Sequence, residues 1–168
     1  MRVKFKNILN YSCGIRFIFE NLKLSSPLST HFFLESPIIT DDSELKNEYS
    51  YLSQFLDLLR TNSNFLSQSE EISSSLCHIK DIRNTIDRLS NGIILDDIEL
   101  YEIKNLTLVT LKIQEILSNY NQTAIIFPNL KDVLSILDPE NRGINSFYIY
   151  TVYDHQLSEL RNKLNSCD

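Results

Sequence analysis

The sequence predicts an all-α fold, an irregular multi-helix bundle with one short extended segment near residues 144–152. Helix breakers are scarce, because only 3 glycines and 4 prolines occur in 168 residues. Hydrophobic residues make up 42% of the chain, which is a globular value. Apolar side chains recur at steps of three and four residues over long stretches, which is the spacing of an amphipathic helix. A chain of this length fits one domain, so we expect a single helical domain over residues 1–168.

The N-terminal part of the chain predicts two short helices after a short opening segment. The first is expected over about residues 15–23. A loop or a helix start follows at residues 25–29, where Pro27 suits a first helical turn. The second short helix is expected to contain residues 31–34.

The clearest amphipathic helix of the first half begins after Thr40 or Asp41, because either residue is a good N-cap. Its end is expected near residues 61–64. The segment 65–75 is rich in Ser and Glu and is expected to form a weak helix or a loop. The apolar positions of the amphipathic helix are Leu45, Tyr49, Leu52, Phe55, Leu56 and Leu59.

A further helix is expected over about residues 76–90, and Gly92 is expected to end it as a C-terminal cap with positive φ. Asp96 and Asp97 then open a long helix that runs to about Ser118, since acidic residues suit a first turn. One face of the helix before Gly92 carries Leu76, Ile79, Ile82, Ile86 and Leu89.

The long helix over residues 96–118 carries two apolar stripes, so we expect it to lie centrally, with neighbours on two sides. Its polar remainder is narrow and lies near Asp97, Lys104 and Glu115. The first stripe comprises Leu95, Ile98, Leu106, Val109, Ile113 and Ile116, and the second comprises Leu100, Ile103 and Leu111.

The C-terminal part predicts a shorter helix over residues 128–137, with Pro128 at its start. Pro139 and Gly143 indicate a loop, which is followed by extended chain or a short hairpin up to residue 153. A last amphipathic helix is expected from about Asp154.

The charge and the cysteines exclude several classes of protein. The formal net charge is −6, so this chain alone is expected to bind DNA poorly, because phosphate neutralisation supplies most non-specific affinity. Cys13, Cys77 and Cys167 are odd in number and far apart, which disfavours a disulfide framework or a zinc site and suits a reducing cytoplasm. Neither a signal peptide nor a membrane-spanning run is expected, and therefore no membrane partner.

No pattern predicts a catalytic, cofactor-binding or metal-binding residue. None of the glycines begins a GxxxxGK[ST] loop, so ATP hydrolysis is not expected from this chain. The segment 137–143 resembles a calcium loop only faintly, because Ile149 stands where a glutamate is required, and we expect a turn. Cys77 and His78 are adjacent on the expected helix and point about 100° apart, so they cannot pair as nucleophile and base. We expect a buried Cys77 beside a surface His78.

Four charged residues precede the glycine turn. Asp81 and Arg88 can lie on neighbouring turns, and so can Arg83 and Asp87, within one helix or between helices. We expect these charges to hold the orientation of helices, with direct contact to a ligand as the alternative.

The chain from residue 81 to residue 100 has a distinctive order of features. A helix with the pattern Asp-hydrophobic-x-x-x-hydrophobic-x-Arg-Leu precedes a short glycine turn and a helix with an acidic start. The residues are Asp81-Ile82-Arg83-Asn84-Thr85-Ile86-Asp87-Arg88-Leu89, then Asn91-Gly92, then Asp96-Asp97-Ile98-Glu99-Leu100. This arrangement resembles the helical core of the MutS family of DNA mismatch-repair ATPases, and its MutS2-like branch in particular.

The resemblance extends over most of the chain. Ser25-Ser26-Pro27-Leu28-Ser29 and Asp42-x-x-Leu45 are similar to the opening helices of that branch. Leu137-Asp138-Pro139-Glu140-Asn141-Arg142-Gly143-Ile144 and Leu157-Ser158-Glu159-Leu160-Arg161 are similar to the segment that enters its lever arm. The resemblance therefore implies that about residues 153–168 begin a lever-type helix.

By this resemblance the chain is a non-catalytic helical core, an N-terminal portion of a longer protein, that connects an ATPase to arms that embrace DNA. The chain itself lacks the clamp, ATPase and nuclease domains. ATP and Mg²⁺ would bind elsewhere in the parent, and the partners would be its lever, clamp and ATPase domains, DNA through the full assembly, and a second copy in a homodimer. The residues of the structural motif are Asp81, Arg83, Asp87, Arg88, Gly92, Asp96, Asp97 and Arg161. A self-contained helical protein-interaction module is the alternative.

Overall fold

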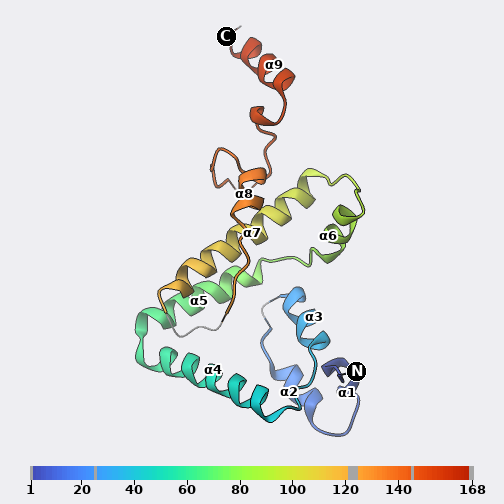
Figure 1. Ribbon diagram of the computed structural model, residues 1–168, viewed down its shortest axis with the longest axis vertical. Helices are drawn as coiled ribbons and strands as arrows, with labels where there is room; N and C mark the ends of the chain where they lie inside the picture. The colour runs from blue at the N-terminus through green and yellow to red at the C-terminus, as the bar shows by residue number, and fades with distance from the viewer. Residues whose placement is uncertain (1, 25, 121–124, 145, 167–168) are drawn as a thin grey trace. The chain divides into compact units, whose positions relative to one another are not determined.

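Figure 1 shows the computed structural model of the chain, which describes residues 2–24, 26–120, 125–144 and 146–166. Across these residues the fold is all-helical, as the sequence predicts, with 67% of them in helices and no β-sheet. The chain forms two compact units. The first unit contains residues 1–81 and 112–126, and the second contains residues 82–111 and 127–168.

Three short helices open the first unit: α1 (Phe5–Ile8), α2 (Ile15–Asn21) and α3 (Pro27–Glu35). The Ser26 side chain caps α3 by accepting a backbone N–H, and Pro27 takes the first helical position, as predicted. Phe33 on α3 stacks on Phe5 of α1 and on Phe19 of α2, with ring centroids 4.7 and 5.8 Å apart. This aromatic stack holds the three helices together, since each is too short to be stable alone.

Helix α4 (Asp42–Thr61) begins after Asp41, whose carboxylate accepts two backbone N–H groups at 2.9 Å, so the predicted N-cap is confirmed. Helix α5 (Ser63–Cys77) follows almost directly. Asn62 ends α4 and also caps α5 through its side chain. The segment 65–75 is therefore helical throughout, because a cap of its own stabilises a stretch with little intrinsic preference for helix.

Phe65 is the buried centre of the first unit and is only 2% exposed. Its ring lies against Tyr120, with centroids 4.6 Å apart, and against Phe55 at 6.1 Å. The Tyr120 hydroxyl donates to the Gln68 side-chain oxygen at 2.7 Å, so the polar end of that ring is satisfied on α5.

The predicted helix over residues 76–90 is wrong in its first half, because the chain leaves the helix after α5 and starts a new one, α6 (Arg83–Ser90). The first two N–H groups after α5 bond to carbonyls three residues back, which tightens and ends the helix. Ile79 and Ile82 lie in the connecting segment and are still buried, at 6% and 5% exposed. The apolar spacing of the sequence is therefore the same as that of a helix here, although the buried side chains of Ile79 and Ile82 belong to a non-helical connection.

Gly92 ends α6 in the left-handed region, with φ +72°, as predicted. The Gly92 N–H bonds to the Leu89 carbonyl and the Ile93 N–H bonds to the Arg88 carbonyl, both at 3.0 Å. This pair of bonds is a Schellman motif, which satisfies carbonyls that the helix end leaves without a partner.

Gly92→Ala is expected to destabilise the protein by about 1–2 kcal/mol, because an L side chain pays this cost in the left-handed region. A Cβ at this position would have nothing within 4 Å, so the cost comes from the backbone alone. Urea unfolding of the wild type, Gly92→Ala and Gly92→Asn measures it. The Gly92→Asn variant should lose less stability than Gly92→Ala, since asparagine tolerates positive φ. Equal stability of all three proteins would contradict the expectation.

The long helix α7 (Asp97–Ser118) begins where the sequence predicts. The Asp96 carboxylate accepts the Glu99 N–H at 2.8 Å, and the Glu99 carboxylate accepts the Asp96 N–H at 3.1 Å. This reciprocal pair is a capping box. Residues of α7 up to Leu111 belong to the second unit and those from Lys112 belong to the first unit.

The expectation for the polar face of α7 is only partly confirmed, because Asp97 and Glu115 are exposed but Lys104 is buried. Lys104 is fully buried and Thr107 is 3% exposed, whereas Ile98 of the first apolar stripe is 60% exposed. Ile116 and Leu117 are the buried apolar residues of this helix. The middle of α7 thus carries a buried charge at a position where the sequence predicts an exposed polar residue.

The rest of the second unit contains α8 (Lys131–Leu137) and α9 (His155–Asn165), with a 3-10 turn at Thr151–Tyr153. Helix α8 starts three residues after Pro128, later than predicted, and the Asn129 side-chain oxygen accepts the N–H of its first residue, Lys131, at 3.1 Å. Helix α9 begins after Asp154, which caps it. The described residues between α8 and this turn form no hairpin. Of the helices in the described part of the chain, none is long and apolar enough to cross a membrane.

Candidate functional site

The most unusual feature of the second unit is a buried ion pair. The Lys104 Nζ atom on α7 lies 3.1 Å from the Asp138 Oδ2 atom at the end of α8, and the two side chains are 0% and 1% exposed. Lys104 also donates to the Ser146 carbonyl at 3.5 Å. Each charge would be costly to bury alone, so the pair fixes α7, α8 and the following segment to one another.

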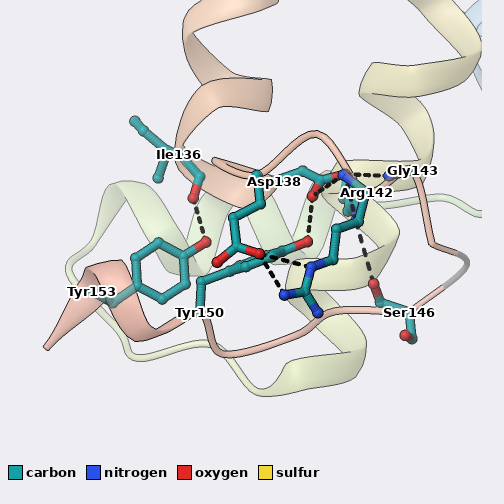
Figure 2. A network of polar contacts seen from close by, with 9 residues as sticks. Ile136, Asp138, Arg142, Gly143, Ser146, Tyr150 and Tyr153 are labelled. Atoms are coloured by element: carbon teal, nitrogen blue, oxygen red, sulfur yellow. Dashed lines mark hydrogen bonds and ion pairs between the residues drawn. The ribbon is translucent and has the colours of Figure 1, made fainter. Parts of the chain in front are cut away.

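The loop after α8 folds around the Asp138 carboxylate. The backbone N–H groups of Arg142 and Gly143 donate to it at 3.1 and 2.8 Å, and so does the Tyr150 hydroxyl (Figure 2). Positive φ values at Asn141 (51°) and Gly143 (59°) turn the chain back toward the carboxylate. The predicted turn in this segment is confirmed, and its centre is Asp138.

These contacts shift two pKa values. Burial raises the pKa of Asp138, but the hydrogen bonds from Tyr150, Gly143, Lys104 and Arg142 outweigh burial and lower it to about 2. Burial raises the pKa of Tyr150 to about 12, and the Asp138 charge acts in the same direction. At neutral pH the site therefore holds a carboxylate and a protonated phenol.

The low pKa of Asp138 is expected to make stability fall in acid. Because its folded pKa of about 2 lies below the ordinary value of 3.8, Asp138 stabilises the fold at pH values above about 4. About 2 kcal/mol of this stabilisation is lost as the pH falls from about 4 to 2. Urea unfolding across this range tests the sign and size, with Asp138→Asn as the control. A wild type and a variant with parallel pH profiles would contradict the assignment.

Aromatic rings and guanidinium groups cover the outer side of this cluster. The Arg142 guanidinium lies over the Tyr148 and Tyr150 rings, 5.0 and 5.4 Å from their centroids. Arg161 on α9 lies 4.9 Å from the Tyr148 centroid and donates to the Ile149 carbonyl at 2.9 Å. The predicted motif residue Arg161 thus fastens α9 to the segment that carries Tyr150.

The structure excludes one form of the predicted charge pairs around α6. Asp81 precedes the first helical residue, Arg83, so a pair of Asp81 with Arg88 within one helix is excluded. Arg88 instead pairs with Glu99 on α7. Asp87 is exposed on α6. The pattern of charges around Arg88 could not predict the pair with Glu99, because Glu99 lies beyond the turn at Gly92.

The structure brings several motif residues together at the connection between α6 and α7. Arg88, Gly92 and Asp96 lie there, because the Schellman motif and the capping box meet across a short segment. Asp97 begins α7 beside them. Arg161 is not among them, because it contacts Tyr148 and the Ile149 carbonyl.

Three residues of the buried site were not among the predicted motif residues: Lys104, Asp138 and Tyr150. The available signal was a lysine in the middle of a helix that is apolar on two sides. Such a lysine must be buried with a partner when the helix is central. The sequence does not say which carboxylate that partner is.

The expectation for Cys77 and His78 also changes. Cys77 is exposed rather than buried, since it is the last residue of α5 and not part of a continuous helix. The His78 Nδ1 atom lies 2.8 Å from the Ser74 carbonyl oxygen, which helps to end α5.

The first unit offers a second candidate, an open cleft of about 390 Å³ on α4. Its walls are mainly apolar and aromatic, with one carboxylate. None of the 20 residues of α4, all of them described, is buried. The cleft is lined by Glu48, Tyr51, Leu52, Phe55 and Ile125.

Comparison of the chain with protein-family models, curated proteins and solved structures finds no match.

Proposed function

We propose that this chain is a non-catalytic helical scaffold, the lever-connecting core of a MutS-like protein of DNA mismatch repair or recombination. In this role it couples an ATPase in another part of the parent protein to arms that embrace DNA. ATP and Mg²⁺ bind to that ATPase, the parent acts in the cytoplasm, and DNA is held by the full assembly, which can be a homodimer.

The observation that carries the proposal is the anchoring of α7 in both compact units. In the second unit, the capping box at Asp96 and the buried pair of Lys104 hold the helix. In the first unit, Lys112 pairs with Glu71 at 2.7 Å, and Ile116 and Leu117 are buried. A continuous helix fixed in this way supports a mechanical role, because coupling between sites needs packed elements with discrete arrangements.

The coding sequence around this chain provides the most direct test. Beyond Asp168 it is expected to encode further lever helices and a GxxxxGK[ST] loop. If the reading frame ends at Asp168, the scaffold proposal is contradicted.

The electrostatic part of the proposal has its own test. Fluorescence anisotropy with labelled duplex DNA at low salt should show little binding by this chain, because its net charge is −6. Tight, salt-sensitive binding would show that this part of the protein holds DNA directly.

A self-contained interaction module is the second candidate, and the cleft on α4 favours it. An amphipathic helix with no buried residue offers an apolar face that a partner helix could cover. A reading frame confined to this chain would support this candidate over the scaffold.

A further inference from the structure

Five large apolar side chains are exposed at the connection between α6 and α7. The most exposed is Ile94, at 90%, in the connecting segment itself. We call the five together the turn patch. They are Ile86 (43% exposed), Leu89 (50%), Ile93 (46%), Ile94 (90%) and Ile98 (60%).

The backbone under the turn patch is held in a defined conformation. The Schellman motif places Ile93 against the last turn of α6, because its N–H bonds to the Arg88 carbonyl at 3.0 Å. The Arg88 side chain also reaches the Ile94 carbonyl at 3.5 Å and pairs with Glu99. The capping box then fixes the start of α7. These hydrogen bonds and this ion pair therefore fix the backbone that carries the isoleucines of the turn patch.

The surroundings of the turn patch are acidic. Residues 83–102 contain two arginines and five acidic residues, and one of those arginines, Arg88, is neutralised by Glu99. In the sequence, Asp87 follows Ile86 on α6, and Asp96 and Asp97 precede Ile98, and all three carboxylates are exposed. Exposed apolar side chains interspersed with carboxylates are complementary to an apolar surface that carries basic groups.

We propose that the turn patch is a docking surface for a basic amphipathic helix of a partner protein. The apolar side of that helix covers the isoleucines, and its lysines or arginines face Asp87, Asp96 and Asp97. This inference goes beyond the scaffold function and does not depend on the MutS resemblance, because it uses only exposure and charge.

Two physical arguments favour a helix over a second copy of this chain. Five side chains offer a few hundred Å² of apolar surface, whereas a stable protein interface needs about 800 Å² per partner. A two-fold dimer through the turn patch would also bring the neighbouring carboxylates close to those of the second copy, which is repulsive. An anionic membrane surface is disfavoured for the same electrostatic reason.

The test uses two labelled peptides, one of leucine and lysine and one of leucine and glutamate, each with leucine on one helical face. Fluorescence anisotropy measures the affinity of each peptide for the whole chain at low and at high salt. Two double variants are compared with the wild type. The isoleucine variant carries Ile94→Asn and Ile98→Asn, and the aspartate variant carries Asp87→Asn and Asp97→Asn. Leu164→Asn is the matched control, because Leu164 is 70% exposed on α9, away from the turn patch in sequence. Circular dichroism checks that every variant is folded.

The expected result is binding of the lysine peptide alone. The isoleucine variant should weaken it by about tenfold or more, and the aspartate variant should weaken it less and flatten the salt dependence. Leu164→Asn should bind like the wild type.

Three results would overturn the proposal. The first is equal binding of the two peptides, or an equal loss in the Leu164→Asn control. The second is a dimer in sedimentation equilibrium that Ile94→Asn dissociates, which would assign the surface to a second copy. The third is binding of vesicles of anionic or neutral phospholipid that the same substitution abolishes, which would assign it to a membrane.

Discussion

Asp138→Ala is expected to destabilise the protein by about 3–5 kcal/mol, because it leaves the Lys104 charge buried without its partner. The loss includes the acceptor of three other donors, the Tyr150 hydroxyl and the N–H groups of Arg142 and Gly143. A single domain is stable by only about 5–15 kcal/mol, so this substitution removes a large part of the total. Urea unfolding followed by circular dichroism measures the change.

A double-mutant cycle separates the ion pair from simple loss of packing. Lys104→Met alone should also be destabilising, because it leaves a buried carboxylate. Asp138→Asn alone is the second single variant of this cycle. Lys104→Met combined with Asp138→Asn should be less destabilised than Lys104→Met and Asp138→Asn predict together, since neither variant residue is charged. The control is Asp132→Ala on the exposed side of α8, which should cost no more than about 1 kcal/mol. Additive single effects would show that the two charges do not stabilise each other.

The part of the fold that could be predicted from sequence is the part that neighbouring residues determine. Asp41, Ser26 and Asp154 each precede a helix and cap it, as their side chains favour. Gly92 and Asp96 were predicted for the same reason, because positive φ and a capping carboxylate are requirements of a few adjacent residues.

The parts that could not be predicted depend on contacts between residues far apart in the chain. The apolar spacing through Ile79 and Ile82 continues across a break in the helix, because burial is not a property of helices alone. Lys104 and Asp138 are 34 positions apart, and no local pattern pairs them. The candidate site was missed for this reason, since its central ion pair is tertiary.

Phe65→Ala is expected to destabilise the first unit by about 3–5 kcal/mol, since removing a buried aromatic ring leaves a cavity. Phe65 is 2% exposed and supports both Tyr120 and Phe55. Phe65→Leu should cost less, because it keeps more of the apolar volume. Phe32→Ala is the matched control, as Phe32 is 58% exposed and should change stability by no more than about 0.5 kcal/mol. Thermal and urea unfolding measure all three.

Hydrogen exchange in the same variant then tests the coupling role of α7. Loss of Phe65 should lower the protection of the amides from Lys112 to Ser118, which belong to the first unit. Because helix formation is cooperative, the amides from Asp97 to Leu111 should also lose protection if α7 transmits the change. Protection that falls in one part of α7 and stays constant in the other would mean that the helix does not couple the two units. A scaffold that transmits motion requires loss of protection along the whole of α7. A helix that opens at one end without affecting the other end cannot carry a mechanical signal.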